Sequence, residues 1–146
     1  MKTMKKIITI FSLSTLMLVL PVTSFSDQDN RNKIKLPEMM KQHMLGNMRD
    51  HMLAIHEIQL ALSKNELDKA ADIAEQRIGM SSLVTHNAAH MAPYMPKAMQ
   101  DIGTEMHHAA SRFALSAKEG DTLKTMGKLA QVTQQCVACH AAYQIN

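Results

Sequence analysis

Apolar residues recur along most of this chain at alternating spacings of three and four, which is the period of a packed helix. Stripes of this kind run from residue 37 to about 63, 66 to 80, 97 to 119 and 122 to about 143. Aromatic residues make up only 3% of the chain and there is no Trp, which disfavours a β-sandwich or barrel core. The pattern therefore predicts an all-α fold, an antiparallel four-helix bundle with mostly short connections.

Two of the stripes matter for the site. The first contains Leu45, Met48, Met52, Ile55, Gln59 and Leu62, and the last contains Met126, Leu129, Thr133, Cys136, His140 and Tyr143. Gly120 fits a helix C-terminal cap, and Asp121 can cap the helix that follows it. Residues 83–93 are predicted as either a further helical stretch or an ordered loop, ending in a turn bracketed by Pro93 and Pro96.

The first 26 residues have the pattern of a signal peptide. Three lysines within the first six residues precede an apolar run over residues 7–20, and Ser24-Phe25-Ser26 offers small residues for cleavage before Asp27. An uncleaved membrane anchor is the alternative, but the run is short for a span of about 20 residues. We therefore expect export to the periplasm, a flexible lead-in over 27–36 and the helical domain over 37–146.

Cleavage changes the charge of the protein. Three of the 16 Lys and Arg residues lie in the removed segment and none of the 13 Asp and Glu residues does, so the mature chain has no formal net charge. A neutral chain without a basic patch is not expected to bind nucleic acid, and after cleavage it is not expected to be integral to the membrane. Thiols in an exported protein oxidise unless something occupies them.

The only two cysteines belong to the run Cys136-Val137-Ala138-Cys139-His140, a C-x-x-C-H motif. This is the attachment signature of c-type haem. Two thiols three residues apart on a helix can form thioethers with the two vinyl groups of one haem, and the adjacent His can ligate the iron from the same side. The motif predicts one covalent haem c, held by Cys136 and Cys139 with His140 as proximal ligand.

A C-x-x-C pair has two other common uses. A thioredoxin-like dithiol belongs near a βαβ pattern, and this chain has no strand signal there. A zinc site needs a second pair of ligands, which His107 and His108 or His86 and His90 could supply. Adjacent helical residues diverge by about 100°, however, so at least one of His107 and His108 is expected to be exposed.

The run CVACHAAY close to the C-terminus resembles the end of class II cytochromes c, the cytochrome c′ proteins and their low-spin relatives. That family is an antiparallel four-helix bundle with haem among the helices, and the resemblance extends in helix order over the mature chain. Its members usually carry Arg after the aromatic residue, near a haem propionate, whereas Gln144 follows Tyr143 here. Gln brings no positive charge, so the propionate environment is expected to differ.

In that family the residue opposite the proximal His decides the function. Low-spin members supply a Met from the first helix and carry electrons, and high-spin members leave an apolar face that binds small gases. Met48 best matches the expected position, with Met44 and Met52 one turn earlier and later, and a thioether ligand favours reduced iron. His51 would give bis-His ligation but lies beside the stripe. Packing alone is the other use of such methionines.

The sequence therefore predicts an exported carrier of single electrons, with redox proteins as its partners. A homodimer is compatible with this prediction. The alternative is a high-spin protein that binds NO or CO at an open distal site. No arrangement of catalytic residues emerges, so no enzyme is predicted. A second group around the two prolines suits copper, although core packing explains it too. Its members are His86, His90, Met91, Met95 and Met99.

Overall fold

The computed structural model describes residues 28–146, which are mostly helical with little strand, and confirms the all-α class. The predicted signal peptide lies outside the described residues. Four long helices account for most of the fold: α1 (Glu38–Ser63), α2 (Leu67–Arg77), α4 (Lys97–Lys118) and α5 (Thr122–Ala142). Short elements η1 (Met80–Ser82), α3 (Ala88–Met91) and η2 (Ala92–Tyr94) connect α2 to α4.

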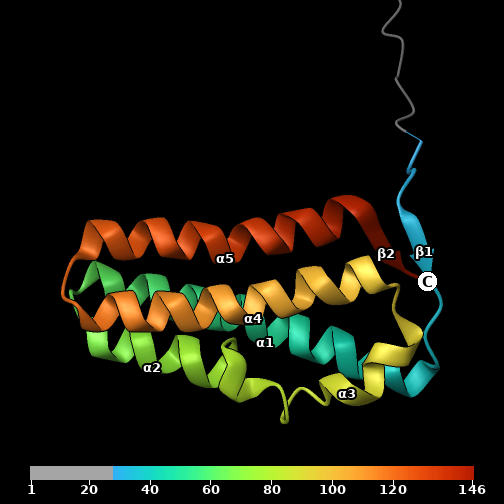
Figure 1. The fold of residues 1–146 in the computed structure, drawn as a ribbon, viewed down its shortest axis with the longest axis horizontal. Helices are drawn as coiled ribbons and strands as arrows, with labels where there is room; N and C mark the ends of the chain where they lie inside the picture. The colour runs from blue at the N-terminus through green and yellow to red at the C-terminus, as the bar shows by residue number, and fades with distance from the viewer. Residues whose placement is uncertain (1–27) are drawn as a thin grey trace, which may run out of the picture.

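The long helices lie side by side along the longest axis of the molecule (Figure 1). Helix α1 packs against α2, α2 against α4, and α4 against α5. Within residues 28–146, no comparable packing joins α1 to α5. The two helices that carry the candidate ligands are therefore not closely packed on each other.

The main core lies away from the haem-type motif, where small residues let the helices approach closely. Ala70, Ala71 and Ala74 of α2 are almost completely buried, as the second stripe predicts. Phe113 of α4 is the largest fully buried side chain and packs among them. This alanine-rich end gives the four helices a fixed arrangement and leaves the other end free for a site.

The first stripe does not fill this core. Met52 is 70% exposed and Gln59 is exposed too, whereas the buried face of the second half of α1 is formed by Ala54, Ile58, Ala61 and Leu62. Helix α5 shows a similar offset, because Thr125 and Val132 outside the predicted stripe are buried while Met126 is 44% exposed, although Leu129 of the stripe is buried as predicted. The predicted stripes were thus wrong as core faces over much of their length. Their period is helical, but the larger side chains on them face the weakly packed side between α1 and α5.

Helix ends follow the local signals in part. Gly120 follows α4 with φ +85°, a left-handed conformation that favours glycine, and the Asp121 side chain accepts a hydrogen bond of 2.9 Å from the Lys124 N–H. The second helix ends at Arg77, three residues before the predicted Met80. The last helix ends at Ala142, and Tyr143 begins a strand instead.

A small parallel sheet ties the two ends of the described chain together. Strand β1 (Asn32–Ile34) pairs with β2 (Tyr143–Ile145), with Asn32 opposite Tyr143 and Ile34 opposite Ile145 (Figure 1). Ile34 is only 6% exposed. Part of the segment predicted as a flexible lead-in is thus hydrogen-bonded next to the end of α5.

Among the described residues, no helix is both long enough and apolar enough to cross a bilayer.

Candidate functional site

A cavity of about 430 Å³ lies where α1 and α5 face each other without packing, and its lining is mostly apolar. Its size falls within the range of about 300–1,000 Å³ that is usual for small-molecule and cofactor sites. Helix α5 contributes Cys136, Cys139 and His140 to the lining. Helix α1 contributes Met44, Asn47, Met48, His51, Met52 and Ile55. The structure thus brings together every residue that the sequence predicted to hold haem.

The α1 side of the cavity is built by helical spacing. The residues at 44, 48, 52 and 55 are one turn apart, so they form a row along the helix, and 47 and 51 extend that row. Three thioethers therefore face one space. Sequence reasoning placed His51 beside the stripe, but it lies three residues after Met48 and lines the same cavity.

The three methionines differ in environment. Met44 is 6% exposed and is buried with Ile34, Met91 and Met99. Met48 is half-buried and packs against this Met-rich cluster, as do Cys139 and Tyr143. Met52 is 70% exposed. Met44 is thus fixed by packing and Met52 reaches solvent, while Met48 lies between these extremes near a haem-type cysteine.

The two cysteines lie in the last two turns of α5, and both are free, partly buried thiols. Burial raises the pKa of Cys136. Burial, and secondarily the neighbouring Cys136, raises the pKa of Cys139. Redox-active C-x-x-C pairs show the opposite shift, because they lie at a helix N-terminus that stabilises the thiolate. The environment of this pair therefore does not fit a thioredoxin-like dithiol.

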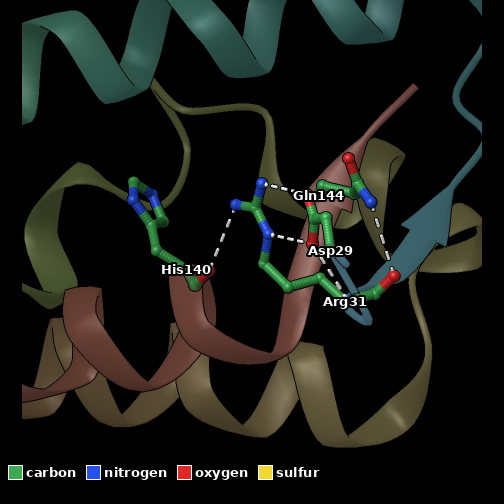
Figure 2. Close-up of polar contacts among 4 residues, drawn as sticks. All are labelled: Asp29, Arg31, His140 and Gln144. Atoms are coloured by element: carbon green, nitrogen blue, oxygen red, sulfur yellow. Dashed lines mark hydrogen bonds and ion pairs between the residues drawn. The ribbon is translucent and has the colours of Figure 1, made fainter. Parts of the chain in front are cut away.

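His140 lies at the rim of the cavity and is exposed. Figure 2 shows its ring directed away from a cluster of polar side chains that contacts its main chain. In that cluster the Arg31 guanidinium donates to the His140 main-chain oxygen at 3.3 Å and to the Asp29 carboxylate at 2.7 and 2.9 Å (Figure 2). A cation near the C-terminal end of a helix is favourably placed with respect to the helix dipole.

The side chain of Gln144 is neutral, so it places no charge at the cavity. Its side-chain amide is within 3.5 Å of the Arg31 main-chain oxygen, across the strand pair (Figure 2). A cation does contact the motif, namely Arg31 from the N-terminal segment, which sequence reasoning missed because nothing in the local sequence links it to His140. Hydrogen bonds and the charge of Arg31 hold the pKa of Asp29 near 2.

The predicted His–Met group around the two prolines is only partly assembled, because all of its members except His90 line the cavity. Met91 and Met99 are buried in the Met-rich cluster and Met95 packs against it, but His90 is exposed. His86 instead turns to two other imidazoles, His51 of α1 and His107 of α4. His108 is exposed, as expected for one of the adjacent pair.

The zinc alternative needed a histidine pair to meet the cysteines, and neither pair does so at the cavity, because His90 and His108 are not part of its lining. Within residues 28–146, no three His, Cys, Asp or Glu side chains lie as they stand in a metal-binding arrangement. Tyr94 is 45% exposed, whereas Tyr143 packs against the Met-rich cluster, as Cys139 does.

Comparisons with protein-family models, with curated proteins and with solved structures find no match for this chain.

Proposed function

We propose that this protein is an exported c-type cytochrome that carries single electrons through one covalent haem. The observation that carries the proposal is the convergence of the C-x-x-C-H residues of α5 and the methionine row of α1 on one mostly apolar cavity. These two groups lie at opposite ends of the domain sequence, so only the fold brings them to one cavity.

The residues present fit the cofactor. Cys136 and Cys139 border the cavity with free thiols, and His140 follows them at its rim. Cys139 also packs against the Met-rich cluster, so the attachment point is fixed to the core. Cys136 and Cys139 would hold the haem through thioethers, and His140 would be its proximal ligand. When bound, the haem supplies a one-electron Fe(III)/Fe(II) couple.

Met48 is our choice for the sixth ligand. Its half-buried side chain lines the cavity and packs against the same Met-rich cluster as Cys139, whereas Met44 is part of that buried cluster and Met52 is largely exposed. A thioether stabilises reduced iron and raises the reduction potential. With both axial positions filled, no position is left for a substrate, which favours electron transfer over catalysis.

The proposal extends to the fold and the setting. Helices α1, α2, α4 and α5, packed in sequence order, support an antiparallel four-helix bundle like that of class II cytochromes c. The N-terminal pattern supports the periplasm as location, where redox proteins would be its partners, and a homodimer is a further proposal from the family resemblance.

The test is an optical spectrum of the mature protein, produced in the periplasm together with a haem-attachment system. We expect a low-spin spectrum that CO does not change, and a high-spin, CO-reactive spectrum for Met48→Ala. Met39→Ala is the matched control, because Met39 is on the same helix but 77% exposed. If the wild-type protein is high-spin and binds CO, the proposal of an electron carrier fails. The alternative, a protein that binds NO or CO at an open distal site, then takes its place.

A further inference from the structure

Three imidazoles from separate parts of the chain meet in the wall of the cavity. His51 comes from α1, His86 from the segment between η1 and α3, and His107 from α4. Their ring centres are 4.7 Å apart for His51 and His86, 5.6 Å for His86 and His107, and 6.1 Å for His51 and His107. The proposed electron carrier uses none of these rings.

Hydrogen bonds fix which nitrogen carries the proton in two of the rings. The Ser82 hydroxyl donates to the Gly79 main-chain oxygen at 2.7 Å, so its oxygen is left to accept from His86 Nδ1 at 3.2 Å. His107 Nδ1 donates to the main-chain oxygen of Ile78. Both rings therefore have their proton on Nδ1 and an unprotonated Nε2 with a free lone pair.

The third ring contributes a nitrogen without a partner. His51 Nε2 is buried and has no hydrogen bond among the described residues. Burial is the main cause that lowers the pKa of all three histidines, to about 4 for His51. The rings are thus neutral at neutral pH, which is the form of imidazole that binds metal ions.

The spacing of the rings suits a single ion. Metal–nitrogen bonds of about 2.0–2.1 Å put neighbouring ring centres about 5–5.5 Å apart in a trigonal or tetrahedral site. The observed separations of 4.7–6.1 Å bracket that distance. The nitrogens do not converge as the rings stand. The ring centres are already close to the required spacing, so the nitrogens would have to converge by turning of the rings within the limits set by the hydrogen bonds of His86 and His107.

Hydrogen-bond partners hold the histidines of the cluster in place, as similar partners do for the ligating histidines of known metal sites. A main-chain oxygen and a hydroxyl orient His107 and His86, which is the usual second layer around ligating histidines. His43 and Asn47 of α1 both hydrogen-bond the His86 main-chain oxygen, at 2.9 and 3.1 Å. The loop that carries His86 is thereby fixed to the helix that carries His51.

The charge of the surroundings selects the ion. Among the described residues no Asp or Glu lines the cavity, and nearby Asp50 is paired with Arg77. The protein side chains of the lining therefore supply no negative charge to balance a divalent ion, which favours a monovalent one. Imidazole is a good ligand for copper. We propose that His51, His86 and His107 form a site for one Cu(I) ion, separate from the haem iron.

The experiment is anaerobic Cu(I) titration of the mature, haem-bearing protein against a chromophoric Cu(I) chelator. Both thiols are consumed in that protein, so they do not compete for copper. We expect one Cu(I) per chain, and X-ray absorption at the copper edge with nitrogen and no sulfur neighbours. If no haem is attached, the proposed function fails, and the titration is repeated after alkylation of the thiols, so the two failures are distinguishable.

The variants are His86→Asn and His107→Asn, with His90→Asn and His108→Asn as controls at exposed positions. We expect copper affinity to fall about 100-fold in the first pair and to stay unchanged in the controls. Ser82→Ala keeps all three ligands and is expected to lose about tenfold, typical for the outer partner of a metal ligand. The Ser82→Ala variant still tests the site if His86→Asn and His107→Asn prevent folding.

Three results would overturn the site. They are the absence of stoichiometric Cu(I) binding, equal affinity in the variants and the controls, and a changed haem spectrum of copper-free His51→Asn. The last result would mean that this imidazole ligates the haem iron.

Discussion

The guanidinium of Arg31 donates a hydrogen bond to the main-chain oxygen of His140, which lies 109 residues further along the chain. The same guanidinium is held by the Asp29 carboxylate (Figure 2). The N-terminal segment thus contacts the last residue of the C-x-x-C-H motif directly. Together with the β1–β2 pair, this contact fixes the end of α5 from which His140, the proposed proximal ligand, projects.

The Asp29–Arg31 pair predicts a measurable titration. The pKa of Asp29 is lowered to about 2 from 3.8, first by the Arg31 side-chain hydrogen bonds and then by the Arg31 main-chain N–H. Because the folded-state pKa is depressed, the contribution to stability is present above pH 3.8 and is lost as the pH falls through about 2. Carbon NMR of the Asp29 carboxyl group should give this low value. In Arg31→Ala it should rise toward 3.8, and an unchanged value would mean that the pair does not form.

The strand pair predicts an anchoring role for Ile34. This side chain is 6% exposed among Met44, Met91 and Met99, so Ile34→Ala leaves a cavity in the Met-rich cluster. We expect a loss of about 2–4 kcal/mol in the free energy of unfolding, measured by urea denaturation. Lys33→Ala is the control on the same strand, where the side chain is exposed, and should change stability by less than about 0.5 kcal/mol. Equal effects of the two would argue against packing of β1.

Structural features that depend on residues close together in the sequence could be predicted from it. The C-x-x-C-H residues are local, and helical spacing alone predicts that Met44, Met48 and Met52 share one side of α1. Helix class followed from the same period. The predicted core faces of α1 and α5 differ from the observed ones because a row of large side chains was interpreted as core. In the structure small alanines fill much of the core, and the row borders a cavity.

Contacts between distant segments were beyond such reasoning. His51, His86 and His107 come from two helices and a loop, so no spacing connects them. The strand pairing of residues 32–34 with 143–145 also depends on where α5 ends, and its short polar strands carry no clear β pattern. For the same reason Arg31 could not be associated with His140 in advance.

Removal of both thiols should weaken the fold. A group bound only to the native state adds stability, and without it the cavity of about 430 Å³ is left unfilled between α1 and α5. We expect Cys136→Ala with Cys139→Ala to be haem-poor and to unfold at a clearly lower temperature than the parent, by circular dichroism. Val137→Ala is the matched control, since Val137 lies between the cysteines and is 68% exposed. The same melting temperature without haem would show that the cofactor does not stabilise the helices.

The two buried methionine candidates can be separated by Leu, which keeps the volume and removes the sulfur. Met44 is packed by Ile34, Met91 and Met99, so Met44→Leu should cost less than about 1.5 kcal/mol and keep the low-spin spectrum. Met48→Leu should be equally well folded but high-spin and reactive with CO, because the leucine has no donor atom.

Measuring spectrum and stability on the same samples makes the comparison decisive. If Met44→Leu turned high-spin while Met48→Leu stayed low-spin, the ligand would be Met44, and its burial would reflect coordination geometry instead of packing. If both variants stayed low-spin, Met52→Leu and His51→Asn would identify the ligand among the other α1 residues that line the cavity. Met52 would then have to turn inward from a position in which it is 70% exposed, at a cost in side-chain entropy that a lower affinity for the iron would reveal.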